Sequence, residues 1–314
     1  MTRRVAAVDC GTNSLRLLVA DVDPGCGELT DVARRMEIVR LGQGVDQTGR
    51  LAPEALARTA GVLREYADVI VRTAAGAVRM VATSATRDAS NTAEFTRQVE
   101  EILGVAPEVL TGSEEAVLSF TGATAELAGP HGGPFLVVDI GGGSTEFVLG
   151  EAGQPPGAAI SVDIGCVRMT ERHLHGDPPA PAQLAAAASD IDAALDAVGA
   201  AVPVRQARTL IGLAGSVTTV AGIALGLPAY DPARIHHARV SAAGVHEVTE
   251  SLLAQTRTAR AAIPVMHPGR VDVIGGGALI LDRIMQRFGF GEVLVSEHDI
   301  LDGIAWTLAA DGRP

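Results

Sequence analysis

Residues 136–149 read LVVDIGGGSTEFVL, two apolar runs separated by three consecutive glycines and bracketed by Asp139 and Glu146. Each apolar run is typical of a buried β-strand. Glycines between them favour a tight turn, because glycine adopts left-handed conformations and lets a ligand approach the backbone closely. The backbone N–H groups of such a turn can bind phosphate. Taken singly, the stretch is equally compatible with a glycine-rich hairpin that binds nothing.

The opening of the chain repeats this pattern. Residues 5–22 read VAAVDCGTNSLRLLVADV, again a strand, an aspartate, a glycine turn with small hydroxyl side chains, and a second strand. Asp9 and Asp139 hold equivalent places, so the two halves resemble a distant duplication of one unit. The pair of turns suggests two loops that close on one phosphate-bearing ligand from opposite domains.

The remaining pattern alternates strands and helices, which indicates an α/β protein. Apolar spacing and turn signals predict helices, strand–glycine–helix units and a final strand and helix. Helices are expected at 53–73, 91–103 and 182–200, and a further helix is expected to begin with Ser113 as its N-cap. A strand that runs into a polar turn is expected at 78–89. The strand–glycine–helix units are expected at 209–225 and 271–289, and the final strand and helix at 293–309. The Gly/Pro-rich stretch 129–134 (GPHGGP) is the expected domain boundary.

Composition excludes several classes of function. The formal net charge is −12, and all 25 basic residues are arginine, so a P-loop with its lysine and Schiff-base chemistry are both ruled out. An acidic chain without basic clusters argues against binding to nucleic acid or an anionic membrane, and no apolar run is long enough to cross a bilayer. The three cysteines have no metal-like spacing, which favours reduced thiols in a cytoplasmic protein.

The acidic residues are unevenly distributed. No arginine lies between Arg97 and Arg168, whereas ten Asp and Glu residues do. Most of these suit a solvated surface, but Asp139 and Glu146 lie inside apolar strands and therefore suggest a bound cation. His236 and His237 are adjacent and point in different directions, which favours surface histidines over a metal pair.

Four segments taken together resemble the exopolyphosphatase/guanosine pentaphosphate phosphohydrolase (Ppx/GppA) family. They are DCGTNSLRLL, ATSATRDASN, GSEEA and VVDIGGGSTE, in this order and spacing, and the resemblance extends over nearly the whole chain. It implies two ribonuclease-H-like domains of the actin, Hsp70 and sugar-kinase superfamily, with the active site in the cleft between them. The domains would be 1–127, completed by 299–314, and 128–298.

The resemblance also implies roles for individual residues. Glu115, the second glutamate of GSEEA, matches the general base that activates water. Asp139 and Glu146 match residues that hold Mg²⁺ or another divalent cation, with Asp9 facing them. The residues that match phosphate-binding positions are Gly11, Thr12, Asn13, Ser14, Arg87, Gly141, Gly142, Gly143, Ser144 and Thr145, and Arg16 is a further candidate.

The implied activity is hydrolytic release of terminal orthophosphate from inorganic polyphosphate or from guanosine pentaphosphate, a nucleotide of the stringent response. The chain ends at Pro314 and so resembles the short, two-domain type, for which we expect a preference for short polyphosphate or pppGpp and poor processivity. A homodimer is common in the family. Two alternatives stay open: a small-molecule kinase of the same superfamily, and a non-catalytic (p)ppGpp sensor or actin-like scaffold.

Overall fold

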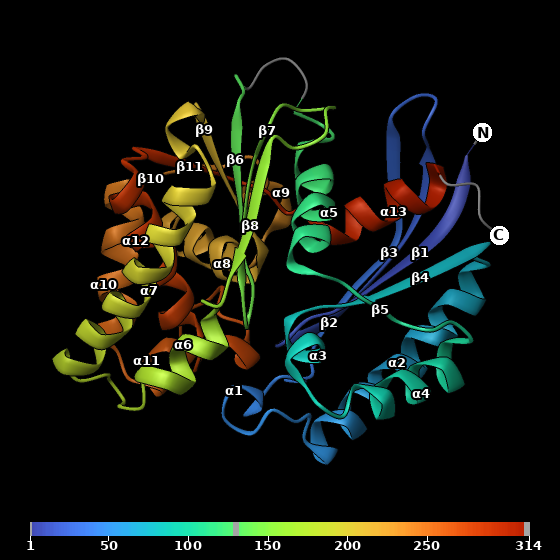
Figure 1. Ribbon diagram of the computed structural model, residues 1–314, viewed down its shortest axis with the longest axis horizontal. Helices are drawn as coiled ribbons and strands as arrows, with labels where there is room; N and C mark the ends of the chain where they lie inside the picture. Colours follow the sequence, from blue (N-terminus) through green and yellow to red (C-terminus); the bar gives the residue numbers. More distant parts are fainter. Residues whose placement is uncertain (1, 128–131, 311–314) are drawn as a thin grey trace. The chain divides into compact units, whose positions relative to one another are not determined.

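The computed structural model describes residues 2–127 and 132–310. The chain folds into two compact units, Met1–Ala125 with Asp299–Pro314, and Glu126–His298 (Figure 1). The domain bounds given above stay a prediction. They include residues 128–131 and 311–314, which lie outside the described residues. Residues 129–131 of the expected boundary segment 129–134 also lie outside the described residues. None of the described helices has the length and apolar character that a membrane span requires.

The first unit is built on a five-stranded sheet in the order β3-β2-β1-β4-β5. The first three strands are antiparallel neighbours, and β4 and β5 run parallel to β1. Its elements are β1 (Arg3–Cys10), β2 (Ser14–Asp23), β3 (Glu28–Ile38), α1 (Val45–Thr48), α2 (Pro53–Thr73), β4 (Ala77–Ala82), α3 (Ser84–Asp88), α4 (Thr92–Leu103), β5 (Glu108–Val109), α5 (Gly112–Thr124) and α13 (Ile300–Ala310).

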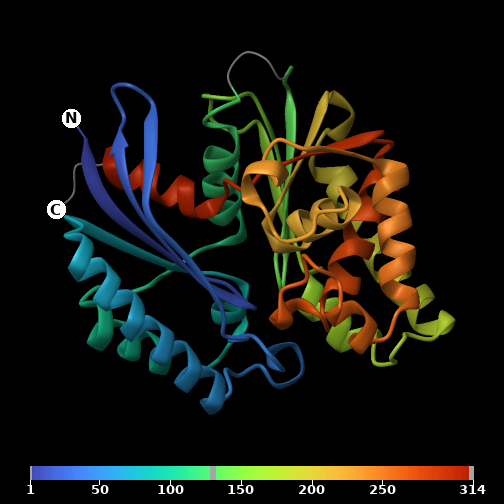
Figure 2. The same cartoon turned by 180° about the vertical axis from the view of Figure 1, so that it is seen from behind.

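Helices cover both faces of this sheet, which explains why β1 is apolar almost throughout. Ala6 and Val8 pack in the cluster formed with α2 and α4, whereas Val5 and Ala7 pack in the cluster that includes α13. Successive side chains of a strand point to opposite faces, so a strand buried on both sides needs a continuous apolar run. Figure 2 shows α2 and α4 along one face of the sheet and α13 against the other.

The second unit repeats this topology. Its sheet has the order β10-β11-β9-β6-β7-β8, in which β6, β7 and β8 are antiparallel and β9 and β11 are parallel to β6. Its elements are β6 (Phe135–Ile140), β7 (Thr145–Gly150), β8 (Ala158–Val162), α6 (Cys166–His173), α7 (Pro181–Ala201), a 3₁₀ turn (Val204–Gln206), β9 (Thr209–Leu213), α8 (Ala214–Ala224), α9 (Pro232–Ile235), β10 (Arg239–Ser241), α10 (Ala242–Ala254), α11 (Arg257–Ala261), a 3₁₀ turn (Pro268–Arg270), α12 (Ile274–Phe288) and β11 (Glu292–Val295). The α/β class is thus confirmed, and Asp9 and Asp139 each precede the last residue of the first strand of their sheet.

Two local predictions are wrong. Residues 271–289 contain no strand: the glycines of IGGGAL lie in the first turn of α12, where a Cβ on Gly277 would come within 2.2 Å of the Ser216 hydroxyl. These glycines therefore serve close packing rather than a turn. The polar turn expected after β4 is the short helix α3, which begins directly after Thr83.

One ion pair between α10 and α12 predicts a pH effect. His246 Nδ1 lies 3.1 Å from Oδ2 of the buried Asp282, and this hydrogen bond, with the charge of Asp282, raises the pKa of His246. The folded-state pKa then exceeds the unfolded value of about 6.5, so the pair stabilises the fold below that pH and the contribution is lost as the pH rises through the folded pKa. We expect Asp282→Asn to lower the pKa of His246, followed by ring NMR signals. An unchanged His246 titration in Asp282→Asn would contradict the assignment.

Candidate active site

The predicted site residues of the first unit follow the carboxyl ends of its three parallel strands. The loop 11–14 follows β1, α3 follows β4, and α5 follows β5, so all three start at one edge of the sheet. Two contacts link them there. Thr12 Oγ1 lies 2.8 Å from Ser84 Oγ, and Arg87 Nη1 lies 3.3 Å from Glu115 Oε2.

The loop of the first unit is a tight hairpin turn. Gly11 N donates to Ser14 O at 3.0 Å, and the carbonyl oxygens of Thr12 and Asn13 accept from N–H groups of segment 39–42 at 2.8–3.1 Å. Within the described part of the chain, no hydrogen bond uses the N–H of Thr12 or Asn13. A turn whose carbonyls are occupied and whose amides lack a protein partner suits an anion.

The loop of the second unit is built in the same way. Gly141 N donates to Ser144 O at 3.0 Å, and the carbonyl oxygens of Gly141 and Gly142 accept from N–H groups of 166–168 at 2.9–3.1 Å. The N–H groups of Gly142 and Gly143 have no hydrogen-bond partner among residues 2–127 and 132–310. Each unit therefore carries one turn suited to phosphate.

Acidic side chains form a row across the sheet of the second unit. Asp139 on β6 and Glu146 on β7 are direct cross-strand partners, and Glu146 pairs in turn with Ser161 on β8. Glu146 is 1% exposed, and its Oε1 accepts a 2.7 Å hydrogen bond from the Ser161 hydroxyl. Two buried carboxylates on adjacent strands repel each other, and a divalent cation with oxygen ligands would relieve that repulsion. This donor set fits Mg²⁺.

The matching row of the first unit has a different charge pattern. The cross-strand partner of Asp9 is Arg16, whose Nε and Nη2 both donate to Asp9 Oδ2, at 3.0 and 2.7 Å. Oδ1 of Asp9 is buried and has no hydrogen-bond partner in the described structure. Burial raises the pKa of Asp9, in opposition to Arg16. An orphaned, buried carboxylate oxygen fits the prediction that Asp9 contacts a cation or its water.

Helix α5 positions Glu115 in its first turn. The N-cap is Thr111, not the predicted Ser113: the Thr111 hydroxyl accepts from Glu114 N at 3.3 Å, and Glu114 Oε2 accepts from Thr111 N at 2.8 Å. This reciprocal pair is a capping box, and it lowers the pKa of the exposed Glu114. Glu115, in contrast, is buried beside Arg87, whose Nη1 also donates to Leu110 O at 2.9 Å.

Several residues near the predicted ones escaped the sequence interpretation. Arg168 Nε donates to Gly143 O at 2.6 Å and so helps to fix the second loop. The Asp299 carboxylate pairs with Arg16.

Two predicted phosphate-binding residues have other contacts in the structure. Thr145 donates through its hydroxyl to Ile164 O. Arg16 is engaged by two aspartates, and its contact with substrate stays a prediction.

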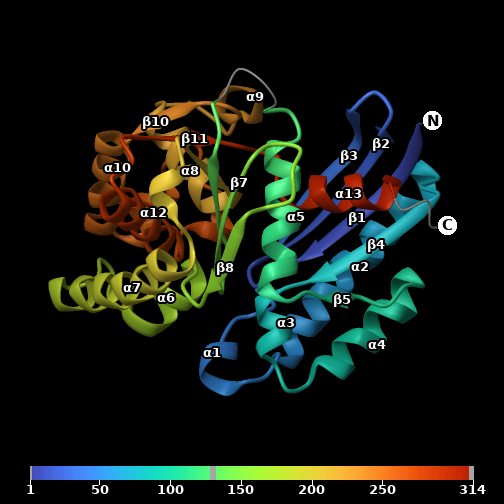
Figure 3. The same ribbon diagram turned by 45° about the horizontal axis from the view of Figure 1, so that its top comes forward.

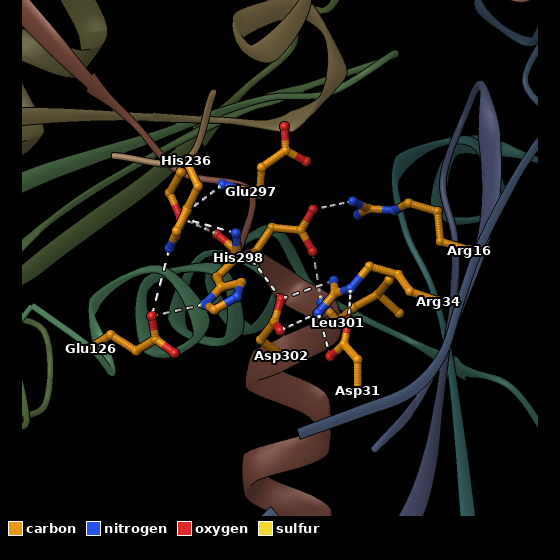
Figure 4. A network of polar contacts seen from close by, with 11 residues as sticks. Arg16, Asp31, Arg34, Glu126, His236, Glu297, His298, Leu301 and Asp302 are labelled. Atoms are coloured by element: carbon orange, nitrogen blue, oxygen red, sulfur yellow. Dashed lines mark hydrogen bonds and ion pairs between the residues drawn. The ribbon is translucent and has the colours of Figure 1, made fainter. Parts of the chain in front are cut away.

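The histidines expected at the surface instead form a half-buried cluster in the second unit (Figure 4). Glu126 Oε2 lies 3.6 Å from both His236 Nε2 and His298 Nδ1, and the His236 ring stacks on His237 with centroids 3.8 Å apart. His236 Nδ1 accepts from Glu297 N at 3.1 Å, so the proton of the neutral ring is on Nε2, facing Glu126. Burial and the neighbouring histidines lower the pKa of His236 to about 4. Glu126, His236 and His298 could together hold a metal ion, but His236 would first have to move its ring proton from Nε2 to Nδ1 and give up the bond from Glu297 N.

Comparison with known proteins identifies the family. The model of the Ppx/GppA phosphatase family matches residues 18–309. The chain therefore belongs to the Ppx/GppA phosphatase family, which confirms the resemblance seen in the sequence. A crystal structure described as an exopolyphosphatase-like protein has 42% sequence identity, a TM-score of 0.93, and coverage of 98% of this chain and 97% of that one.

Two curated relatives carry functional names. Exopolyphosphatase 2 of Mycobacterium tuberculosis is 52% identical over 98% of both chains. The guanosine-5'-triphosphate,3'-diphosphate pyrophosphatase of Aeromonas salmonicida is 29% identical over 98% of this chain, which spans 60% of that protein. Both names denote hydrolases of phosphoanhydride bonds.

Proposed function

We propose that the protein is a Mg²⁺-dependent exopolyphosphatase that releases terminal orthophosphate from short-chain inorganic polyphosphate. The observation that carries this proposal is the buried Glu115, held in the first turn of α5 beside Arg87, at the same sheet edge as the turn 11–14. The name of the 52% identical relative supports the same activity. Hydrolysis of pppGpp is the second candidate, supported by the name of the Aeromonas relative.

The proposed reaction is an in-line attack of water on the terminal phosphoryl group. Glu115 accepts a proton from the water as the new P–O bond forms, and the bridging P–O bond breaks so that orthophosphate leaves with the chain shortened by one unit. Backbone amides of a glycine turn bind phosphate oxygens and Arg87 neutralises developing charge, since phosphoryl transfer depends mainly on positioning and electrostatics. Asp139 and Glu146 would hold Mg²⁺, which supplies further charge neutralisation when bound, and Asp9 is a further candidate to contact the ion or its water.

The substrate is tested by phosphate release from size-defined polyphosphates, pppGpp and ATP in parallel, each with and without Mg²⁺. We expect release from short polyphosphate or pppGpp that disappears with EDTA, and slower turnover per site on chains of hundreds of units. Labelling of an acceptor from ATP without free phosphate would show a kinase. Tight (p)ppGpp binding without hydrolysis would show a sensor.

The packing under the second loop gives a separate prediction. A Cβ on Gly165 would lie 2.4 Å from Gly142 O and 2.6 Å from Gly143 N, so Gly165→Ala must displace the glycine turn. A displacement of about 1 Å in a positioning element can cost about 10²-fold in rate. We expect a loss of that order in phosphate release. Gly157→Ala is the matched control, because its Cβ would meet only Leu149 O at 3.7 Å; equal activity of the two variants would refute the role of the turn.

Oligomeric state and cellular location belong to the same proposal. We propose a cytoplasmic homodimer, as the family resemblance implies, that acts on polyphosphate or guanosine penta- and tetraphosphate rather than on nucleic acid or membranes. The net charge of −12 supports the last point, because nucleic acid and anionic membranes are bound through clustered basic residues. Sedimentation of the purified protein would detect a monomer if the dimer is wrong.

A further inference from the structure

Arg16 is shared between two buried aspartates of the first unit. Its Nε and Nη2 both donate to Asp9 Oδ2, and its Nη1 donates to Asp299 Oδ2. The Asp9 and Asp299 side chains are 4% and 8% exposed. Since Asp9 Oδ2 accepts both donors, the position of its carboxylate depends on where Asp299 holds the arginine. Figure 4 shows Arg16 pointing toward the start of α13.

Asp299 is itself held rigidly at the start of α13. Its Oδ1 accepts from Leu301 N at 3.0 Å, and its own N donates to Asp302 Oδ2 at 2.9 Å, the arrangement of a helix cap. The helix is pressed against α5, because a Cβ on Gly122 would lie 1.9 Å from Asp299 O and one on Gly303 would lie 2.0 Å from Leu118 O. Figure 3 shows α13 beside α5.

A second arginine reaches the same helix end without touching Asp9. Arg34 on β3 donates from Nη2 to Asp302 Oδ1 at 2.6 Å and from Nε to Asp31 Oδ2 at 2.7 Å. The start of α13 thus carries two arginine–aspartate pairs with different consequences. The Arg34–Asp302 pair contributes only to docking of the helix. In the Arg16–Asp299 pair, the same arginine also donates to Asp9, the buried carboxylate whose Oδ1 has no hydrogen-bond partner in the described structure.

We infer that Asp299 is a positioning residue: it holds Arg16, which fixes the Asp9 carboxylate so that Oδ1 is left for Mg²⁺ or for a water that the ion carries. This inference rests on the proposed function only in taking Asp9 as a metal residue. Groups that orient a metal ligand typically change metal affinity by about 10–100-fold when they are removed. Asp299 suits this task because one guanidinium donates to both carboxylates, to Asp9 through Nε and Nη2 and to Asp299 through Nη1.

The test is direct binding of Mn²⁺ or Mg²⁺ to the full chain by calorimetry, without substrate, for wild type, Asp299→Asn and Arg34→Gln. Asparagine caps a helix about as well as aspartate, so Asp299→Asn keeps the cap through Oδ1 but replaces the oxygen that accepts from Arg16 with an NH₂ group, which removes both the charge and the hydrogen bond toward Arg16. We expect the dissociation constant to rise about tenfold or more in Asp299→Asn and less than about twofold in Arg34→Gln. Melting temperatures of both variants report on the helix separately.

Each outcome decides the inference. Equal changes in metal affinity for the two variants would assign the effect to docking of α13 and overturn the inference, as would an unchanged affinity in Asp299→Asn.

A double variant gives a second test. Arg16→Gln combined with Asp299→Asn should weaken metal binding no more than the stronger single variant, because both residues act through Asp9. Additive losses would contradict the inference. A wild type that binds the ion but releases no phosphate would refute the proposed function and leave this test intact.

Discussion

Glu115→Gln is expected to lower the rate of phosphate release by about 10²–10⁴-fold, the usual contribution of a positioned general base. Glutamine keeps the size of the side chain and can still accept a hydrogen bond from Arg87, but its amide oxygen does not take a proton from water. Binding of short polyphosphate should therefore persist, and calorimetry with the variant should give a dissociation constant close to that of wild type. The measurement is steady-state release of orthophosphate at saturating substrate.

The neighbouring glutamate supplies the matched control for this prediction. Glu114 is exposed and closes the capping box with Thr111, a role that glutamine also fills. Glu114→Gln should retain nearly full activity and an almost unchanged melting temperature. Wild-type rates in Glu115→Gln, or equal losses in the two variants, would remove Glu115 from the mechanism.

Asp139→Asn is expected to cause the second large effect, a loss of Mg²⁺ binding together with at least about 10²-fold in rate. The carboxylate is buried opposite Glu146 in the strand pairing, so its neutralisation removes half of the paired charge that attracts the ion. Calorimetric titration with Mn²⁺ measures the affinity without substrate. Phosphate release over a range of Mg²⁺ concentrations then shows whether excess ion restores the rate.

A control for Asp139→Asn is available in the same unit. Asp163 precedes the second loop's partner helix α6, but its side chain is 74% exposed and 3.8 Å from Arg168. Asp163→Asn changes the net charge by the same amount and should leave both Mn²⁺ affinity and rate within about twofold of wild type, as for most surface substitutions. If Asp139→Asn bound Mn²⁺ as tightly as Asp163→Asn, the cation would have to be held elsewhere.

The sequence predicted those features that depend on local pattern. Both turns, with Asp9 and Asp139 before them, follow from strand alternation and adjacent glycines, and each is closed by the same bond from a glycine N–H to a serine carbonyl three residues later. The same reasoning failed at the glycines of α12, since close packing against Ser216 requires glycine just as a turn does. The N-cap was misplaced because Thr111 and Ser113 are both good caps, and only the bond to Glu114 distinguishes them.

Interactions between distant segments could not be predicted. Arg16 and Asp299 are 283 positions apart, and no local pattern connects them. The difference between the two cross-strand pairs could not be predicted either. Asp9 is paired with Arg16 and Asp139 with Glu146, and this comparison requires the strand register of both sheets. Pairing in three dimensions therefore adds two aspartate partners to Arg16, and its predicted contact with phosphate stays a prediction.

Hydrolysis of short polyphosphate in ¹⁸O-labelled water tests the central claim most directly. If Glu115 activates water for attack on the terminal phosphoryl group, each released orthophosphate should carry one ¹⁸O from solvent and each event should shorten the chain by one unit. The rate at which labelled orthophosphate forms should fall about 10²–10⁴-fold in Glu115→Gln, and formation should stop in the presence of EDTA. Orthophosphate without solvent oxygen, or cleavage inside the chain, would contradict the account.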